Sequence, residues 1–265
     1  MIGQGNTAEI YEFEKNKIIK LFRKGISKEI AIHEYEKAIF IKTYINNAPK
    51  VYDFIDNKGR YGIVYEKIDG KDMIMVMIKS IVRINYYSRM LAHIHLTIHK
   101  NSVKPDQDFT VKNKLISDIQ AEEVMKDKGK EYLVKYLEGL PDGDSLCHFD
   151  YHPGNIMIRG KEPIVIDWMT ACVGNPCADI ARTYIVLTYG ELPNAGYLVR
   201  KLVKLLQRHV CKVYYGEYLK RSKLNEEEIE KWMLPVAAAR LREWIPNSEK
   251  KTLLAFVNKK MKNIN

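Results

Sequence analysis

Short hydrophobic runs rich in the residue types that favour β-strands, separated by polar turns, occupy most of the first 70 positions of the chain. Strand-like runs cover residues 9–13, 17–22, 50–56 and 61–67. Between the second and third runs, hydrophobic residues recur at helical spacing over residues 27–45, and Ser27 stands where a helix N-cap is expected. The pattern therefore predicts a small β-rich lobe with one helix.

From Gly70 onward the hydrophobic spacing becomes helical. Amphipathic segments cover residues 73–99, 111–137, 198–218, 226–243 and 250–261. Two short hydrophobic strands, 155–158 and 163–166, interrupt them and are joined by a glycine-containing turn. We therefore expect an α+β fold with a β-rich lobe over residues 1–69 and a larger, mainly helical lobe over residues 70–265 that contains a β-hairpin.

The composition suits a folded, soluble chain. Hydrophobic residues make up 46% of the 265 positions, so a sizeable core can form. No run approaches the roughly 20 consecutive apolar residues of a membrane span, and the first five residues lack the pattern of a signal peptide. We therefore expect a cytoplasmic protein that has no membrane segment.

The formal net charge is +10, which can attract nucleic acid, a phosphate-bearing surface or an anionic nucleotide. The lysines are scattered and no RNA-binding signature is present, so we expect no nucleic-acid partner. The sequence contains four cysteines: Cys147, Cys172, Cys177 and Cys211. They lack the two tight pairs of a zinc site, and cytoplasmic chains rarely form disulfides, so we expect buried, reduced thiols.

The residues best suited to chemistry lie between His148 and Asp167. Asp150 and Asn155 are five residues apart, and Asp167 lies twelve residues beyond Asn155, after the predicted hairpin. Because a hairpin folds back on itself, its ends meet, which would place Asn155 and Asp167 together as oxygen ligands for Mg²⁺. Asp150 would lie one loop away, where it can accept the proton of a substrate hydroxyl. This arrangement is typical of phosphoryl transfer.

These motifs resemble a known family. The order His-x-Asp-x-x-x-x-Asn over residues 148–155, then a short hairpin, then Ile-Asp-Trp over residues 166–168 is similar to the aminoglycoside phosphotransferase and choline kinase-like superfamily. Asp-Ile-Ala-Arg over residues 179–182 resembles the helix start that follows in that family. Trp168 stands where protein kinases have Phe-Gly, which favours a small-molecule kinase.

The resemblance implies a protein-kinase-like fold that covers the whole chain. It implies that Asp150 is the catalytic base and that Asn155 and Asp167 are the metal ligands. It also implies that Asp179 supports the catalytic segment rather than contacting substrate.

The resemblance further implies a nucleotide site in the N-terminal lobe. Gly3 and Gly5 approximate a glycine-rich loop, in which backbone N–H groups approach phosphates. Lys20, in a strand that follows, matches the phosphate-binding lysine. Glu34 matches the acidic residue that holds this lysine, and Glu36 is the alternative, because the helix register is not determined by the sequence.

The segment that joins the two lobes is the expected adenine site. Residues 65–68 resemble it, and the backbone of Glu66 and Ile68 would contact the base. The implied cofactors are Mg²⁺ and ATP, with GTP as an alternative to ATP.

The leading hypothesis is a small-molecule kinase that phosphorylates a hydroxyl of an aminoglycoside, a sugar or an amino alcohol. The basic end of the chain, residues 250–265, does not favour a polycationic aminoglycoside. A protein Ser/Thr kinase-like enzyme is a second hypothesis, against which the missing Asp-Phe-Gly and Ala-Pro-Glu motifs argue. A non-catalytic nucleotide-binding module is the third. The sequence does not predict the acceptor or the oligomeric state.

Overall fold

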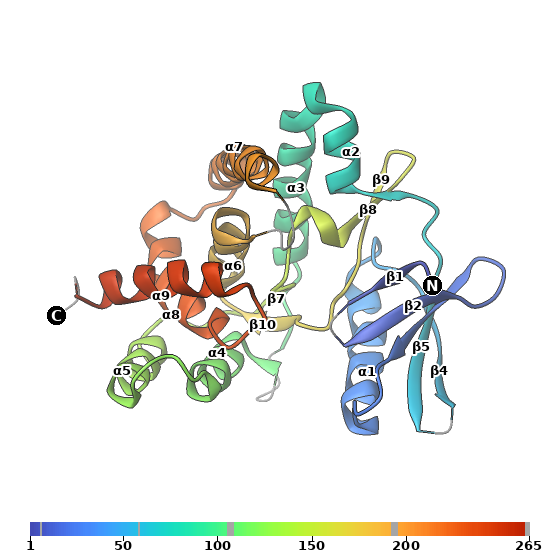
Figure 1. The fold of residues 1–265 in the computed structure, drawn as a ribbon, viewed down its shortest axis with the longest axis horizontal. Helices are drawn as coiled ribbons and strands as arrows, with labels where there is room; N and C mark the ends of the chain where they lie inside the picture. The colour runs from blue at the N-terminus through green and yellow to red at the C-terminus, as the bar shows by residue number, and fades with distance from the viewer. Residues whose placement is uncertain (6, 58, 105–108, 192–195, 263–265) are drawn as a thin grey trace. The chain divides into compact units, whose positions relative to one another are not determined.

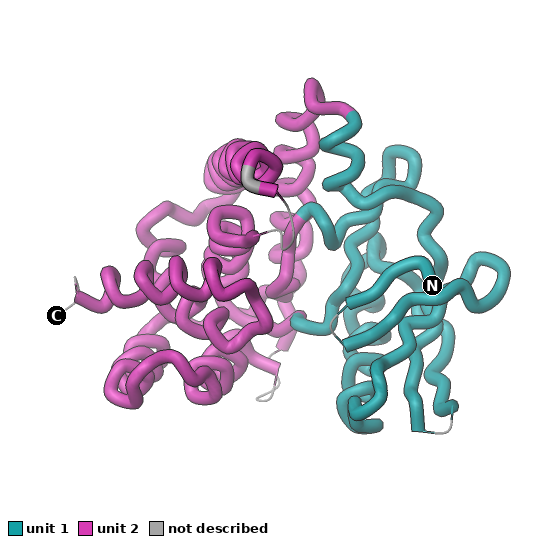
Figure 2. The backbone as a smooth tube through the Cα atoms, viewed as in Figure 1, with its two compact units in different colours: residues 1–79, 153–170 teal, residues 80–152, 171–265 magenta. Residues whose placement is uncertain are grey.

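The structure is a computed structural model that describes the chain apart from residues 6, 58, 105–108, 192–195 and 263–265. The chain divides into two compact units, which Figure 2 shows in different colours. Unit 1 comprises residues 1–79 and 153–170, and unit 2 comprises residues 80–152 and 171–265. Among the described residues, no helix is both long enough and apolar enough to cross a membrane.

Unit 1 contains a five-stranded antiparallel sheet with the strand order β1-β2-β3-β5-β4 (Figure 1). The strands are β1 (Gly3–Gln4), β2 (Ala8–Glu12), β3 (Lys17–Phe22), β4 (Val51–Asn57) and β5 (Arg60–Glu66). Phe22 and Ile63 of the sheet form a buried cluster with Ala31 of helix α1 (Lys28–Tyr44). Aromatic and β-branched side chains such as Phe22 and Ile63 pack well on the pleated surface of a sheet.

Helix α1 begins at the residue that its N-cap predicted. Ser27 Oγ accepts a hydrogen bond from the N–H of Ile30 at 3.4 Å, which satisfies one of the N–H groups that the first turn leaves unpaired. The buried residues of the helix are Ala31, Glu34 and Ile41, which lie on one face. The buried face of α1 therefore carries one carboxylate.

A three-stranded sheet with the order β6-β8-β9 completes unit 1. Its elements and their neighbours are β6 (Lys71–Asp72), helix α2 (Met73–Lys79), the 3-10 turn η3 (Pro153–Asn155), β8 (Ile156–Arg159) and β9 (Glu162–Val165). A Cβ at Gly70 would lie 2.5 Å from the carbonyl oxygen of Ile158, so glycine is required for β6 to reach β8. Because β6 and the hairpin form one sheet, the compact units divide the chain differently from the lobes expected over residues 1–69 and 70–265.

Unit 2 is mainly helical. Its described helices are the 3-10 turn η1 (Ile81–Arg83), α3 (Ile84–His99), α4 (Val111–Ala121), α5 (Asp127–Glu138), α6 (Pro176–Tyr189), α7 (Tyr197–Arg221), α8 (Glu226–Arg240) and α9 (Asn247–Lys262). A two-stranded sheet pairs β7 (Ser145–Cys147) with β10 (Cys172–Gly174). As predicted, all four cysteines are buried and none forms a disulfide.

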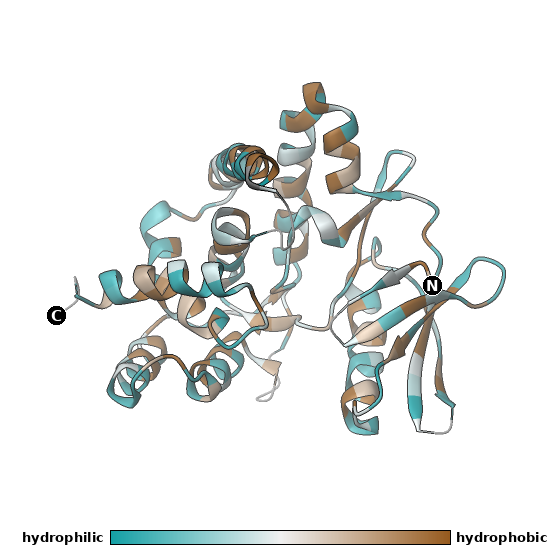
Figure 3. Ribbon diagram, viewed as in Figure 1, coloured by the Kyte–Doolittle hydropathy of each residue, from teal (hydrophilic) through white to brown (hydrophobic). Residues whose placement is uncertain are grey.

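The surface helices of unit 2 are amphipathic. Figure 3 shows hydrophobic and hydrophilic positions alternating along α5 and α9. Leu133 and Leu137 are the buried residues of α5, and Leu253 and Val257 are buried four residues apart on α9. Each helix therefore buries one stripe and leaves its polar face exposed, as its sequence period predicts.

Two helical segments are interrupted where the sequence predicted continuity. The segment 73–99 divides into α2 and α3, and the segment 111–137 divides into α4 and α5. In the second break, the buried carboxylate of Glu122 accepts hydrogen bonds from the N–H groups of Val124 at 2.7 Å and Met125 at 2.9 Å. These side-chain bonds replace helical ones, so the backbone can change direction without leaving N–H groups unpaired.

Candidate active site

The hairpin of β8 and β9 brings Asn155 and Asp167 to the same end. Ile156 is the register partner of Val165, and the N–H of Ile166 donates to the carbonyl oxygen of Asn155 at 2.9 Å. Asp167 follows with a φ of 60°, a left-handed conformation that Asp adopts more readily than most residues. The two residues predicted to hold a metal are therefore neighbours at the base of the hairpin.

Lys20 on β3 joins two carboxylates. Its Nζ lies 2.6 Å from Oε1 of Glu34 and 3.2 Å from Oδ1 of Asp167. Burial lowers the pKa of Lys20, but the negative charges of Asp167 and Glu34 outweigh this effect and raise it, so the ammonium group stays charged. Of the two candidate carboxylates on α1, Glu34 is the partner of Lys20, whereas Glu36 is exposed.

The chemistry of these donors fits a magnesium ion together with a phosphate chain. The Asp167 carboxylate remains 45% exposed beside Lys20, and Asn155 offers an amide oxygen at the same end of the hairpin. Mg²⁺ prefers oxygen ligands, and in nucleotide sites it takes one or two from the protein and others from phosphates. The charged Lys20 supplies the cation that a phosphate also requires.

Gly3 and Gly5 lie where unit 1 leaves room for a side chain. A Cβ at Gly3 would meet the Ile10 side chain at 3.7 Å, and one at Gly5 would meet the Ala8 carbonyl oxygen at 4.0 Å, both ordinary contacts. At Gly62, by contrast, a Cβ would lie 2.7 Å from Ile19. The packing of the protein therefore does not require glycine at positions 3 and 5.

The backbone around Glu66 is partly occupied by the sheet. The N–H of Glu66 donates to Lys50 at 2.9 Å, and the N–H of Lys67 donates to Asn16 at 2.9 Å. The Glu66 carboxylate is bound by Arg159 at 2.7 Å. A base next to this segment would therefore have to use other groups, such as the Glu66 carbonyl oxygen and the backbone of Ile68.

Asp150 lies in unit 2, in the segment that follows β7. The residue before it, Phe149, has a φ of 62°, which is unusual for a bulky side chain. The buried carboxylate of Asp179 holds this turn. Its Oδ2 accepts a hydrogen bond from the N–H of His148 at 2.6 Å, and its Oδ1 accepts one from the N–H of Phe149 at 3.0 Å. Asp179 thus contacts the backbone of the segment that carries Asp150.

The Asp150 carboxylate faces a buried guanidinium group. Its Oδ1 lies 3.7 Å from Nη2 of Arg182. Burial raises the pKa of Asp150, but the charge of Arg182, with smaller contributions from His152 and His148, outweighs burial and lowers it. Asp150 is therefore ionised at neutral pH, where its carboxylate can accept a hydrogen bond from a hydroxyl group.

Sequence reasoning missed the ion-pair cluster around Arg182. Its Nη1 lies 2.5 Å from Oε1 of Glu243, while Nη1 of Arg240 lies 2.7 Å from Oε2 of Glu243 and its Nη2 lies 2.7 Å from Glu249. Trp244, next along the chain, is 91% exposed. The three-residue spacing of Arg240 and Glu243 is a signal that could have indicated one of these pairs. The link to Arg182 depends on packing between distant helices.

The predicted residues fall into two groups. Lys20, Glu34, Asn155 and Asp167 belong to unit 1, whereas Asp150 belongs to unit 2. Asp150 precedes Asn155 by five residues in one continuous segment. The first group combines an ammonium group, two carboxylates and an amide, and Asp150 is an ionised carboxylate.

Comparison with known proteins identifies the family. The sequence of residues 5–208 matches the phosphotransferase enzyme family. The chain belongs to this family. None of the curated protein sequences matches it.

Solved structures share the fold of this phosphotransferase. A ternary complex of APH(2")-IIa with streptomycin and ATP is similar at a TM-score of 0.56 and 16% identity, over 97% of this chain and 90% of that one. An aminoglycoside-3'-phosphotransferase of type VIII is similar at a TM-score of 0.55 and 15% identity, over 84% of each chain. A choline/ethanolamine kinase family protein from Mesorhizobium loti gives 0.51 at 13% identity, over 93% of this chain and 82% of that one. The expected α+β, protein-kinase-like fold is confirmed.

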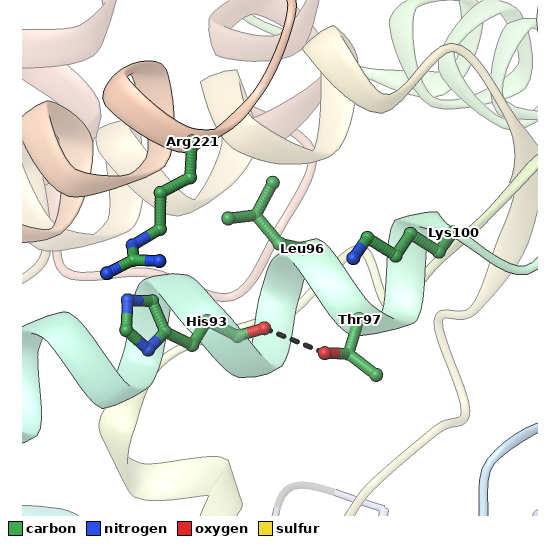
Figure 4. A pocket seen from close by; sticks show the side chains of 5 residues that line it. All are labelled: His93, Leu96, Thr97, Lys100 and Arg221. Carbon is green, nitrogen blue, oxygen red and sulfur yellow. Dashed lines mark hydrogen bonds between the residues drawn. The ribbon is translucent and has the colours of Figure 1, made fainter.

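A separate surface pocket lies on unit 2 of the phosphotransferase (Figure 4). Its volume is about 330 Å³, and its lining residues are His93, Leu96, Thr97, Lys100 and Arg221. His93 and Arg221 both bind the carboxylate of Glu217, and the Thr97 hydroxyl donates to the His93 carbonyl oxygen at 3.0 Å. None of the predicted site residues lines this pocket.

Two buried histidines of α3 also face Asp179. Nε2 of His95 and Nε2 of His99 lie 3.0 Å and 3.2 Å from Oδ2 of Asp179. Burial, with a contribution from His99, lowers the pKa of His95 to about 3. Burial raises the pKa of Asp179, but His95 and His99 outweigh it, so the pKa lies below its usual value. The core of the phosphotransferase therefore holds an ionised aspartate beside a neutral His95.

Acid should destabilise the phosphotransferase through these groups. Unfolded His95 takes up a proton below about pH 6.5, whereas folded His95 stays neutral down to about pH 3. The stability contribution is therefore complete above about pH 6.5 and is lost as the pH falls, and Asp179 adds a further loss below about pH 4. Between about pH 7.5 and about pH 5, we expect the free energy of unfolding in urea to fall by about 2 kcal/mol.

A matched pair of variants checks the source of this loss. His95→Gln should flatten the pH dependence, whereas His33→Gln, at an exposed position on α1, should leave it unchanged. Equal wild-type stability at both pH values would contradict the assignment.

Proposed function

We propose that this phosphotransferase is an ATP-dependent small-molecule kinase that transfers the γ-phosphate to a hydroxyl group of its acceptor. The observation that carries the proposal is the position of the Lys20 ammonium group between Glu34 and Asp167. Asp167 lies at the end of the β8–β9 hairpin that also carries Asn155. Phosphoryl transfer depends on positioning and on neutralising phosphate charge, which these groups can supply.

On the nucleotide side, Lys20 binds the phosphates and Glu34 holds its ammonium group in place. Asn155 and Asp167 hold Mg²⁺, which when bound neutralises negative charge on the phosphate oxygens. The small size of the glycines at positions 3 and 5 lets the backbone approach the phosphates. The Glu66 carbonyl oxygen and the Ile68 backbone contact the base, with ATP as the donor and GTP as the alternative to be compared.

On the acceptor side, Asp150 accepts a hydrogen bond from the hydroxyl group of the acceptor. As the new bond forms between that oxygen and the γ-phosphorus, the bond to the ADP oxygen breaks and the hydroxyl proton passes to the Asp150 carboxylate. Arg182 lowers the pKa of Asp150, so the carboxylate is a weak base that acts first by orienting the hydroxyl group. Proton transfer to it becomes favourable only as the hydroxyl oxygen loses electron density to phosphorus.

We further propose that the acceptor carries an ammonium group, as amino alcohols and amino sugars do. In the cluster beside Asp150, the three carboxylates of Asp150, Glu243 and Glu249 face two guanidinium groups, so the cluster is net negative in a chain of net charge +10. The exposed indole of Trp244 follows Glu243 directly. An indole face binds cations through its electron-rich surface.

Removing the indole should therefore weaken acceptor binding. In Trp244→Ala, we expect KM for the acceptor to rise about tenfold, since a cation held against an aromatic face gains about 1–2 kcal/mol, while KM for ATP stays unchanged. Trp244→Phe should retain most of the affinity. Steady-state kinetics with each substrate varied in turn measures both constants. Equal acceptor KM values in wild type and Trp244→Ala would remove Trp244 from the acceptor site.

The function is tested by a panel of acceptors with ATP or GTP and Mg²⁺, read by the release of ADP or GDP above the rate without acceptor. The panel contains aminoglycosides, choline, homoserine, simple sugars and a mixture of generic protein substrates. Stimulation by a hydroxylated small molecule supports the proposal, and stimulation by ammonium-bearing members over plain sugars supports the acceptor class. Phosphorylation of protein alone would indicate a protein kinase. Nucleotide binding without any stimulation would indicate a binding module.

A further inference from the structure

The Asp179 carboxylate accepts hydrogen bonds from four N–H donors. Its oxygens accept from two backbone N–H groups, those of His148 and Phe149, and from the Nε2 atoms of His95 and His99. Asp179 is 0% exposed. Three of these four bonds, from His95, His99 and the N–H of His148, reach Oδ2, and the fourth, from the N–H of Phe149, reaches Oδ1. The negative charge is thus stabilised by dipoles, and no lysine or arginine takes part in these bonds.

Each histidine is held from its other side by a tyrosine. Nδ1 of His95 lies 2.7 Å from the hydroxyl of Tyr214, and Nδ1 of His99 lies 2.7 Å from the hydroxyl of Tyr218. Because the ionised Asp179 accepts at both Nε2 atoms, each imidazole carries a proton there. His95 is neutral, so its Nδ1 accepts from the Tyr214 hydroxyl, and Nδ1 of His99 shares a hydrogen bond with the Tyr218 hydroxyl. Turning either ring over would break both of its hydrogen bonds.

The spacing of these residues on their helices makes the arrangement a repeat. His95 and His99 are one turn apart on α3, and Tyr214 and Tyr218 are one turn apart on α7, which packs against α3. All four side chains are buried. Two parallel hydrogen-bonded chains therefore run from α7 through α3 to one carboxylate. The His95 ring also stacks on Tyr151, 4.0 Å away, directly after Asp150.

The same atoms could in principle hold a divalent cation, because the ligand atoms of His95, His99 and Asp179 lie within 4.8 Å of one another. A metal would need unprotonated Nε2 atoms. In this structure both Nε2 atoms lie at hydrogen-bonding distance from Asp179 and both Nδ1 atoms from a tyrosine hydroxyl. A hydrogen-bonded network accounts for all of these distances. A bound metal ion would not account better for the contacts between the histidines and the tyrosine hydroxyls.

We propose that His95, His99, Tyr214 and Tyr218 are positioning residues that set the orientation of the 148–150 segment through Asp179. They touch neither substrate nor nucleotide in this role. The proposal rests on the proposed function only in the statement that Asp150 orients the acceptor. Because both tyrosines act on the same carboxylate, each can compensate for the loss of the other. The loss of one tyrosine hydroxyl is therefore tolerated better than the loss of both.

Tyrosine-to-phenylalanine variants test this, because they remove a hydroxyl and keep the ring that fills the core. Tyr214→Phe and Tyr218→Phe should each lower kcat about fivefold, the value of one hydrogen bond. The double variant should lower kcat by more than the roughly 25-fold product of the single effects. KM for ATP should stay unchanged in all three. Tyr136→Phe is the matched control, since its hydroxyl donates to Lys231 outside this network.

Amide hydrogen exchange gives a readout that needs no substrate. In the wild type, the N–H groups of His148 and Phe149 should be protected by Asp179, and in the double variant their exchange should be faster by roughly tenfold. Faster exchange in the double variant supports the positioning role even if no acceptor is found. The exchange measurement therefore separates failure of this proposal from failure of the proposed function. If the double variant does not fold, the same exchange measurement on the single variants decides.

Two results would overturn the proposal. One is unchanged exchange at His148 and Phe149 together with a kcat within twofold of wild type in the folded double variant. The other is Zn²⁺ bound in a one-to-one ratio by the wild type and lost in His99→Gln, because a metal would occupy the Nε2 atoms that donate to Asp179.

Discussion

Replacing Asp150 by Asn should reduce kcat by roughly 10²–10⁴-fold, the usual contribution of a positioned acid or base. Asn has the same shape, but its amide cannot take up the proton of the acceptor hydroxyl. Arg182 keeps its bond to Glu243, so the surrounding cluster should stay folded. The affinity for MgATP should remain within about twofold of wild type, since Asp150 is not among the residues proposed to bind the nucleotide. Stopped-time assays of phosphorylated product, with calorimetry for the nucleotide, measure the two quantities.

The matched control for this variant is Asp142→Asn. Asp142 lies in the loop before β7, and its side chain is 86% exposed in a surface pair with Lys112. Surface pairs of this kind contribute little, so kcat should be unchanged. If Asp150→Asn retains more than a tenth of the wild-type kcat, Asp150 does not act on the acceptor, and the proposed role is wrong.

Replacing Asp167 by Asn should weaken MgATP binding by roughly tenfold to hundredfold, the range found when a group at a metal site is removed. The carboxylate is the stronger of the two proposed magnesium ligands, and it is also a partner of Lys20 at 3.2 Å. Lys20 keeps Glu34 as a partner at 2.6 Å and therefore stays charged. Binding of ATP without Mg²⁺ should change far less, because the lost group acts on the metal. Isothermal calorimetry with and without Mg²⁺ separates these effects.

Asp56→Asn provides a closely matched control, because the Asp56 carboxylate is 45% exposed, as that of Asp167 is, and also pairs with a lysine. This variant should bind MgATP as the wild type does. The metal assignment fails if Asp167→Asn binds MgATP with wild-type affinity, or if it loses the same factor in affinity with and without Mg²⁺.

Local sequence signals predicted the longer strands and helix α1 of unit 1 well. The β3 run from Lys17 to Phe22 was predicted with its observed bounds, and Ser27 marked the start of α1, because strand-forming residue types and capping are properties of a few neighbouring residues. The break at Glu122 was not predicted. The hydrophobic residues on either side of it recur at helical spacing. Helix α4 ends because the buried Glu122 carboxylate accepts hydrogen bonds from two backbone N–H groups.

The same contrast applies to the candidate site. The proximity of Asn155 and Asp167 followed from one hairpin, which is a local structure, and the structure brings them together. The sequence did not determine that Lys20 pairs with Glu34 rather than Glu36, because this choice depends on how α1 is oriented about its own axis against the sheet. The contacts of Asp179 with two histidines were beyond sequence reasoning, because they join α3 and α6, which lie about 80 positions apart. Such contacts depend on how distant helices pack against each other, which cannot be deduced from local residue patterns.

The most direct test of the central claim is to identify the phosphorylated product. Wild-type enzyme, Mg²⁺ and ATP labelled at the γ-phosphate are incubated with the acceptor that most stimulates ADP release, and the product is analysed by mass spectrometry and phosphorus NMR. We predict that the label appears as a phosphomonoester on an acceptor hydroxyl, in amounts equal to the ADP formed, and that Asp150→Asn produces almost none. Label found only as inorganic phosphate, or equal product from Asp150→Asn, would contradict the account.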